Sequence, residues 1–284
     1  MRFCCVNDSV PLTTAALLRT ACAARSLEFV EIDARAFDYA EHRQLAGGDM
    51  LYRPAISIAA IRVEQFLFQE RVASFYRPPE SIYYQPSTSP LRFQRAGLPI
   101  PATVYCSTTQ RGIIRGLVEQ VGGFPIVVKV LGYSSGIGVM KVDSYPILFS
   151  VLDFALAQRH NPLLCAYIDH ATHWRLIVLG DVVVAAYVNE PDADDFRTHA
   201  PNDERSYTTT VRPDLAGIAV QAVQVIQTEF AGVDLLEDQR GNVFLLEANF
   251  PCYFAHPQEV AGIDISGMMV EHLLRKAVGY AASL

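Results

Sequence analysis

The segment Val233-Asp234-Leu235-Leu236-Glu237 is followed, after residues 238–242, by Val243-Phe244-Leu245-Leu246-Glu247-Ala248-Asn249-Phe250. Both segments are largely apolar and have the length of a strand. The residues between them are polar and rich in turn formers. The pattern predicts a β-hairpin near the end of the chain.

Each predicted strand carries an acid in apolar surroundings, Asp234 in the first and Glu247 in the second. Asn249 follows Glu247 by two positions, so both side chains point to the same face of the strand. A buried carboxylate is costly unless a cation or hydrogen bonds compensate for it. Two acids and an amide oxygen on one face would suit Mg²⁺, which can also hold nucleotide phosphates. The alternative is that the acids pair with arginines at a sheet edge.

The composition indicates a globular protein with two or three small subdomains. The chain has 284 residues, of which 51% are hydrophobic and 19% are charged. The formal net charge of −7 argues against a nucleic-acid partner, because few cations are available to neutralise phosphates in bulk. An ATP site is compatible with this charge, since it needs only a few local cations.

The start of the chain has the pattern of a strand, Met1–Val6, rather than a charged leader with an apolar core. No apolar run reaches the roughly 18–20 residues that cross a membrane. The six cysteines lie mostly in apolar segments without paired spacing, which is typical of reduced core residues. These features predict a cytoplasmic protein without a membrane partner.

Residues 1–87 alternate strand and helix patterns, which predicts an N-terminal parallel α/β subdomain. The proline-rich segments 78–79 and 86–90 mark its end. Its predicted elements are strands 2–6, 29–33, 50–53 and 82–85 and helices 12–24 and 58–74.

Two α+β subdomains are predicted to follow, over residues 88–165 and 166–284. The predicted elements of the first are helices 91–96, 108–121 and 144–159 and strands 103–106, 124–131, 139–142 and 163–168. Those of the second are strands 174–179 and 182–189, a mobile loop 191–210, helix 213–230, the hairpin 233–249, a loop through residue 257 and helix 263–278.

Lys129 interrupts the apolar run 124–131. A lysine in a buried strand needs an anionic partner, and a bound phosphate is one candidate. The alternatives are an acidic partner or a solvated sheet face. Three residues later comes Gly132-Tyr133-Ser134-Ser135-Gly136-Ile137-Gly138, whose backbone N–H groups and hydroxyls can cradle phosphate oxygens.

The chain resembles the ATP-grasp superfamily. The resemblance rests on four segments taken together: Lys129, the loop 132–138, Ala231-Gly232-Val233-Asp234 and Glu247-Ala248-Asn249. The branch they resemble is that of the RimK-type carboxylate–amine ligases, which includes glutamate ligases. The resemblance covers roughly residues 88–280. It implies an ATP-grasp fold of mixed α/β class, in which the N-terminal subdomain precedes two α+β subdomains that sandwich ATP.

The resemblance implies an ATP-dependent ligase that forms an amide or peptide bond through an acyl phosphate and releases ADP and phosphate. The expected cofactors are ATP and Mg²⁺, with Mn²⁺ as an alternative metal. The expected partners are a small-molecule or peptide carboxylate and an amine or amino acid. The sequence leaves a homo-oligomer open.

The resemblance also assigns roles to single residues. Arg175 and Arg197 are expected to be catalytic, as cations for the γ-phosphate and the tetrahedral intermediate. The metal would be held by Asp234, Glu247 and Asn249. The nucleotide would contact Lys129, Ser134, Ser135, Gly136, Gly138, Cys165, Tyr167, Ile168 and Asp169.

Departures from the family pattern keep two other functions open. Cys165-Ala166 replaces a Gln-Glu pair of the hinge strand, and His173 stands where the family has an aspartate before Arg175. An earlier ATP lysine has no clear match in the region of Pro86–Pro90, where Arg92 is the only nearby cation. The alternatives are a catalytically weakened relative that binds nucleotide or regulates a partner, and a small-molecule kinase on the same fold.

Overall fold

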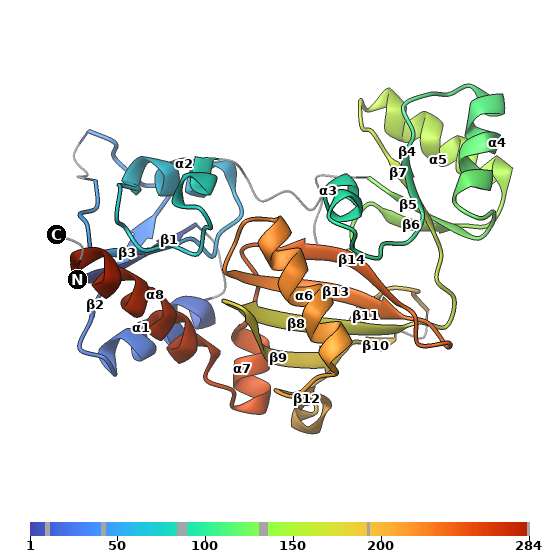
Figure 1. The fold of residues 1–284 in the computed structure, drawn as a ribbon. Helices are drawn as coiled ribbons and strands as arrows, with labels where there is room; N and C mark the ends of the chain where they lie inside the picture. Colours follow the sequence, from blue (N-terminus) through green and yellow to red (C-terminus); the bar gives the residue numbers. More distant parts are fainter. Residues whose placement is uncertain (9–11, 41–43, 84–89, 131–135, 192–193, 283–284) are drawn as a thin grey trace.

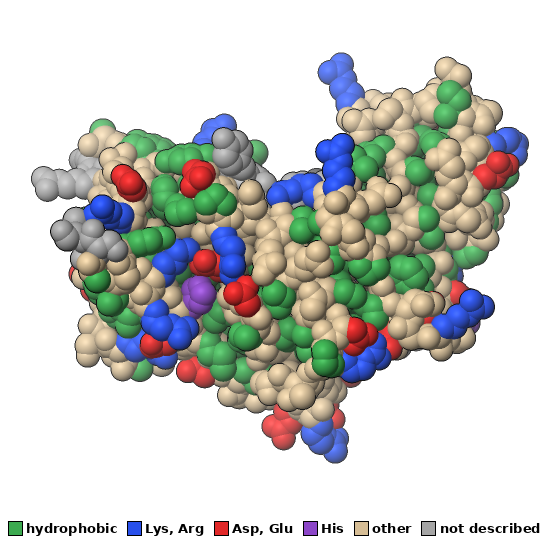
Figure 2. All heavy atoms as spheres, viewed as in Figure 1, with side chains coloured by type: hydrophobic (Ala, Val, Ile, Leu, Met, Phe, Trp, Pro, Cys, Tyr) green, Lys and Arg blue, Asp and Glu red, His purple; other side chains and the backbone are tan. Residues whose placement is uncertain are grey.

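The computed structural model describes residues 1–8, 12–40, 44–83, 90–130, 136–191 and 194–282. Its strands form three main sheets and a two-stranded ribbon, β10-β11, and the sheets lie in three successive parts of the chain (Figure 1). Within these residues, no helix is both long and apolar enough to cross a membrane. On the face shown in Figure 2, the described Lys and Arg side chains are interspersed with Asp and Glu.

The N-terminal unit contains a parallel sheet in the order β2-β1-β3. Strand alternation divides its core. Phe3 and Cys5 pack with Leu18 of α1, whereas Cys4 and Val6 pack with Val63 of α2. The predicted parallel α/β unit is therefore confirmed. Its elements are β1 (Arg2–Asn7), α1 (Leu12–Ala23), β2 (Glu28–Asp33), β3 (Met50–Tyr52), α2 (Ile58–Leu67) and the 3-10 helix η1 (Pro79–Tyr83).

Two predicted elements of this unit are wrong. The predicted helix 58–74 ends at Leu67, because the next apolar residues form an extended segment in which Ala73 pairs with Met50 beside β3. The predicted strand 82–85 is replaced up to Tyr83 by η1, where the backbone N–H of Ser81 donates to the carbonyl of Pro78. Prolines at the start of a helical turn favour it, because their φ is already restricted. Residues 84 and 85 lie outside the described part.

The middle of the chain forms an antiparallel sheet in the order β4-β7-β5-β6. Helices α4 and α5 cover one face, where Ile126 and Val128 of β5 are buried. Helix α3 packs elsewhere, since Phe93 joins the core beneath α6. The elements are α3 (Pro90–Arg95), β4 (Thr103–Tyr105), α4 (Arg111–Gln120), β5 (Ile126–Lys129), β6 (Val139–Val142), α5 (Tyr145–Ala157) and β7 (Leu163–Ala166).

The last part forms a sheet in the order β12-β9-β8-β13-β14, and the predicted hairpin is confirmed as the antiparallel pair β13-β14. The predicted helix 213–230 is too long, because Phe230 already begins β13. The elements are β8 (Thr172–Leu179), β9 (Val182–Val188), β10 (Glu190–Pro191), β11 (Thr198–His199), η2 (Glu204–Ser206), β12 (Tyr207–Thr208), α6 (Pro213–Val225), β13 (Phe230–Glu237), β14 (Val243–Asn249), α7 (Ala255–Ala261) and α8 (Ile265–Ala282).

The two faces of this last sheet have different partners. Leu176 and Val233 face α6, whereas Ile177 and Phe230 pack with α8 and the N-terminal unit. Figure 1 shows α8 beside α1, so this helix joins the first and last parts of the chain. Strand alternation places Arg175 on the same face as Ile177, beyond this apolar contact. The polar end of this face is the candidate site.

Candidate active site

A β-bulge brings the two predicted acids together. Asp234 of β13 pairs with Glu247 of β14, but Leu235 pairs with Leu245, so Leu246 is an extra residue in the second strand. Leu245 packs beneath α6, and the extra residue lets Glu247 point to the opposite face. Sequence period alone would place Leu245 and Glu247 on one face.

Asn249 is hydrogen-bonded to this pair. Its Nδ2 donates to Glu247 Oε1 at 2.6 Å. The amide oxygen of Asn249 remains an acceptor, because an asparagine donates through its nitrogen alone. The three residues expected to hold a metal are thus neighbours on one sheet face.

Strand β8 pairs with β13 on the side away from β14, and there Arg175 lies opposite Asp234. The Nη1 atom of Arg175 is 2.5 Å from Asp234 Oδ2. The side chains of Arg175 and Asp234 are 15% and 9% exposed, so the ion pair is largely shielded from water. Burial raises the pKa of Asp234, but the Arg175 charge, together with His173 and a hydrogen bond with Glu247, outweighs this effect, and the pKa falls to about 2. Asp234 therefore pairs with an arginine and at the same time lies beside Glu247 and Asn249.

Gly232 makes room for this arginine. It lies two residues before Asp234 on the same face of β13, and a Cβ added there would overlap the Arg175 guanidinium. The glycine is needed here for the close approach of a side chain rather than for a special φ angle.

Glu247 has no comparable neutralisation. Burial raises its pKa, and the neighbouring Asp234 charge raises it further, while Asn249 and the charges of Lys129 and Arg175 only partly oppose these effects. Two carboxylates thus share one arginine, and the unbalanced negative charge fits a divalent cation. The described residues contain no cluster of three or more His, Cys, Asp or Glu able to hold a metal ion, so the fit rests on two carboxylates and an amide oxygen.

Lys129 belongs to the antiparallel sheet in the middle of the chain. It ends β5 and points, like Val127, to the face away from α4 and α5. A small apolar cluster lies on that face, formed by Val127, Leu163 and Cys165 with Val139 and Tyr167 packed against it. The Lys129 charge acts to lower the pKa values of both Glu247 and Cys165. The Lys129 charge on this face of the central sheet therefore acts on Glu247 of the C-terminal sheet.

Arg197 is at a different place from Arg175. Its Nη1 donates to the carbonyl of Gly136 at 3.0 Å, and its Nε donates to Asp195 at 2.7 Å. Gly136 has φ +73° and Gly138 has φ +79°, values that favour glycine. Arg197 thus contacts the described end of the Gly/Ser loop. The predicted residues Ser134 and Ser135 lie outside the described part of the chain.

The remaining predicted nucleotide residues follow β7. The Tyr167 ring lies near the Phe196 ring, with 6.5 Å between centroids, and Ile168 is half-buried. Asp169 is exposed, and its Oδ2 lies 3.4 Å from His170 Nε2. Of these three residues, Tyr167 belongs to the apolar face that also carries Lys129.

His173 is a neighbour of the site to which the sequence prediction gave no role. Its Nδ1 lies 2.5 Å from Thr198 Oγ1, and its Nε2 lies 3.4 Å from Asp234 Oδ1. The signal was present, because His173 precedes Arg175 by two positions on one strand and must share its face. His173 therefore connects Asp234 with β11.

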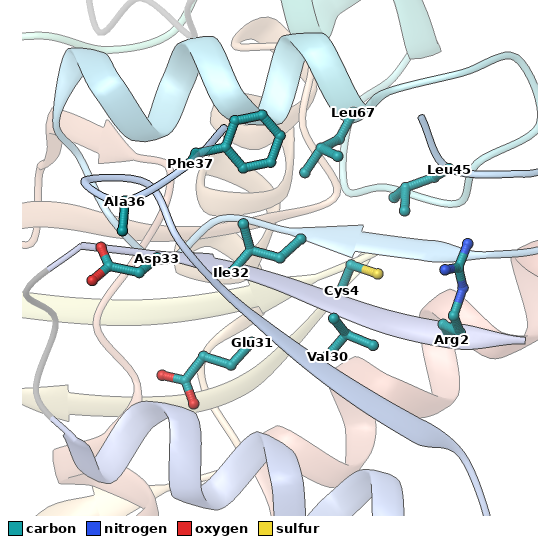
Figure 3. Close-up of a pocket in the computed structure, with 10 residues that line it drawn as sticks. All are labelled: Arg2, Cys4, Val30, Glu31, Ile32, Asp33, Ala36, Phe37, Leu45 and Leu67. Carbon is teal, nitrogen blue, oxygen red and sulfur yellow. The ribbon is translucent and has the colours of Figure 1, made fainter. Parts of the chain in front are cut away.

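Two hollows in the structure lie away from the acids. One, of about 440 Å³, is in the N-terminal unit, where Phe37 and Leu67 lie above Ile32 and Cys4 and Arg2 lies at one end (Figure 3). The other, of about 600 Å³, lies between α5 and β6. Their lining includes neither Asp234 nor Glu247.

The sequence matches a family model described as the RimK-like ATP-grasp domain, over residues 93–273. A probable alpha-L-glutamate ligase from Picosynechococcus sp. is 31% identical over 64% of this chain, and the match spans 60% of that relative's length. A probable alpha-L-glutamate ligase from Methanococcoides burtonii is 29% identical over 73% of this chain and 70% of its own length.

Solved structures share the whole fold at low sequence identity. The ATP-grasp ligase PsnB, complexed with a minimal precursor, Mg and ADP, has a TM-score of 0.70 with 15% identity and 97% coverage of both chains. The D-cycloserine synthetase DcsG has a TM-score of 0.74 with 14% identity, covering 98% of this chain and all of its own. The mixed α/β architecture is therefore an ATP-grasp fold.

Proposed function

Because the chain belongs to the RimK-like ATP-grasp family, we propose that it is an ATP- and Mg²⁺-dependent carboxylate–amine ligase. In the proposed reaction, a substrate carboxylate attacks the γ-phosphate of ATP, forming an acyl phosphate and ADP. The amine then attacks the acyl carbon, phosphate leaves and an amide forms. The observation that carries the proposal is the register of Asp234 with Glu247, with the Lys129 charge acting on Glu247 from the other sheet.

The proposed ATP site lies between the central and C-terminal subdomains, for which we propose the limits 88–165 and 166–284 after an N-terminal subdomain 1–87. The apolar cluster around Val127 and Cys165 offers a surface for the base. Lys129, at the end of the same strand face, would neutralise phosphate oxygens.

The donor set fits Mg²⁺, with Mn²⁺ as the alternative, because carboxylate and amide oxygens are hard ligands. Asp234, Glu247 and Asn249 would hold it, and when bound it would supply positive charge to the phosphates. Arg175 orients Asp234 and is the cation proposed for the reacting phosphate. Arg197 binds the Gly/Ser loop, which would exclude water and protect an acyl phosphate from hydrolysis.

We propose a small acid or a peptide as the carboxylate substrate and an amino acid as the amine. Two observations on similar proteins support these classes. Relatives are named as probable alpha-L-glutamate ligases, and PsnB was solved with a precursor peptide. Glutamate is therefore the first amino acid to test, and the reaction would take place in the cytoplasm, where ATP is available.

The test is a screen of carboxylates with ATP and Mg²⁺, in which hydroxylamine replaces the amine and traps the acyl phosphate as a hydroxamate. We expect hydroxamate together with ADP and phosphate, both dependent on the carboxylate. Parallel reactions without carboxylate measure background ATP hydrolysis. Release of AMP and pyrophosphate would contradict attack at the γ-phosphate, and a phosphorylated product stable to hydroxylamine would favour a kinase. No binding of ATP at millimolar Mg²⁺ would refute the proposed function.

A further inference from the structure

Lysine is rare in this chain, which has 3 lysines and 20 arginines. One of them, Lys276 of α8, forms hydrogen bonds that link the N-terminal unit to the last part of the chain. Its Nζ donates to Glu229 at 2.8 Å and to the carbonyls of Ser74 and Tyr76 at 2.8 and 3.2 Å. The other two, Lys129 and Lys141, lie in the adjacent strands β5 and β6.

These two lysines share one sheet face. Lys129 pairs with Val139 and Val127 pairs with Lys141, so all four residues lie on the face away from α4 and α5. Lys129 and Lys141 are diagonal neighbours, and the Cβ atoms of such a pair are somewhat closer than about 7–8 Å. Two extended lysine side chains from these positions can reach the same polyanion.

Neither lysine forms an ion pair with a carboxylate among the described residues. Lys141 is exposed, and its Nζ lies 3.9 Å from the centroid of the Tyr167 ring. Tyr167 also packs on the apolar cluster with Val127 and Cys165. The face therefore combines an apolar surface with two positive charges that form no ion pair among the described residues.

Two like charges on neighbouring strands repel each other, and an anion placed between them relieves this repulsion. The apolar surface beside them suits a planar base, so the combination fits a nucleotide with a phosphate chain. We propose that Lys141 is a second nucleotide-binding residue, which with Lys129 holds the phosphates of a nucleoside triphosphate. This inference rests on the proposed function and adds a residue to its nucleotide site.

The opposite side of the same subdomain provides a matched comparison. There, the Arg115 guanidinium lies 4.2 Å from the centroid of the Tyr145 ring, on helices α4 and α5. Arg115 is also exposed, and its partner is also a tyrosine. It differs from Lys141 in facing away from Lys129 and the acids. Comparing the two cation–aromatic pairs therefore distinguishes nucleotide binding from simple packing of a cation on a ring.

The first experiment is reductive methylation of lysines in the full-length protein, followed by mass spectrometry. ATP with Mg²⁺ should slow the modification of Lys129 and Lys141 and leave that of Lys276 unchanged. Adenosine should leave the modification of Lys141 unchanged. Equal protection of Lys141 by adenosine would overturn the phosphate assignment, and so would protection of Lys129 without protection of Lys141.

The second experiment compares Lys141→Met with Arg115→Met, since methionine keeps an apolar stem and removes the charge. Calorimetry should show ATP·Mg²⁺ binding weakened about tenfold in Lys141→Met and unchanged in Arg115→Met. Adenosine binding should be the same in both variants. If the wild type binds ATP and Lys141→Met binds it equally well, the inference is refuted and the proposed function stands. If the wild type does not bind ATP, the proposed function itself is refuted.

Discussion

Asp234 and Glu247 are buried side by side, yet their pKa values shift in opposite directions. Burial raises both, but for Asp234 the Arg175 charge, His173 and a hydrogen bond with Glu247 together outweigh burial and bring its pKa to about 2. The difference comes from strand register, because β8 places both Arg175 and His173 beside Asp234. Of the two acids, Glu247 is therefore the one whose ionised form a bound cation would stabilise most.

Replacing Glu247 with glutamine should separate function from folding. The variant loses one negative charge of the proposed metal site, so turnover should fall on the order of a hundredfold or more. The free energy of unfolding should not decrease, because the repulsion between Glu247 and Asp234 disappears with the charge. Calorimetry of Mg²⁺–nucleotide binding and urea unfolding measure the two effects.

The control for this change is Glu259→Gln, at an exposed position on α7. It should leave turnover, Mg²⁺ dependence and unfolding as in the wild type. Wild-type turnover with wild-type Mg²⁺ dependence in Glu247→Gln would remove Glu247 from the metal site.

Gly232→Ala tests the room that Arg175 needs. The added Cβ would overlap the guanidinium, so Arg175 must move and Asp234 loses its partner. We expect the free energy of unfolding to fall by about 1–3 kcal/mol, as for other overpacked sites, together with at least a tenfold loss of turnover.

Gly217→Ala is the control. A Cβ there meets no atom within 4 Å, and in the middle of α6 it should add about 0.5–1 kcal/mol of stability. Equal behaviour of the two variants would contradict the packing argument.

At the scale of elements, the site depends on how strands and loops meet. The bulge in β14 turns Glu247 toward the site, and β11 carries Thr198 to His173 beside Asp234. The loop before β11 carries Arg197, which binds the carbonyl of Gly136. At Gly136, the Gly/Ser loop of the central sheet is thus connected to the C-terminal part by the Arg197 side chain.

Arg197→Ala should weaken this connection without changing the acid pair. We expect a higher KM for ATP and faster proteolysis near residues 132–138, because the Gly136 carbonyl loses its donor. Arg205→Ala is a close control, since Arg205 also pairs with an aspartate two residues earlier, Asp203, but is exposed and contacts no part of the loop among the described residues. The connection would be disproved if both variants were cleaved at the wild-type rate.

At the scale of the whole molecule, α8 joins the first and last units through an ionic cluster. Glu229 precedes β13 and accepts hydrogen bonds from His272 at 3.1 Å and Lys276 at 2.8 Å. Lys276 also binds carbonyls of the N-terminal unit. Burial raises the pKa of Glu229, but His272 and Lys276 outweigh burial, and the pKa lies below its ordinary value of 4.5.

The pH dependence follows from this direction. Because the folded pKa of Glu229 is lowered, its contribution to stability is complete above about pH 4.5 and is lost as pH falls through the folded pKa. At pH 7, Glu229→Gln should reduce the free energy of unfolding by roughly 1.5–3 kcal/mol, the range for hydrogen bonds to charged groups. The difference between wild type and variant should shrink below pH 4.5, as measured by urea unfolding across pH. Glu119→Gln, on an exposed position of α4, should show no such trend. A constant difference from pH 7 to pH 3 would contradict the assignment.

The sequence alone determined the elements with strong local patterns. The hairpin β13-β14 and the parallel N-terminal unit were predicted correctly, because apolar alternation and turn residues specify strands locally. It also singled out the oxygen-rich residues Asp234, Glu247 and Asn249, since acids in apolar strands are rare for energetic reasons. The family resemblance came from the order of such short segments along the chain.

Tertiary structure decided what local patterns leave undetermined. The segment after Leu67 continues a helical apolar pattern, yet it extends because its backbone pairs with β3, a partner distant in sequence. The face to which Glu247 points depends on one extra residue at Leu246, whose effect exists only when β13 fixes the register. The unequal pKa shifts of the two acids likewise need Arg175 from a third strand. Period and propensity act over a few residues, whereas register, burial and charge pairing depend on strands that meet only in the folded chain.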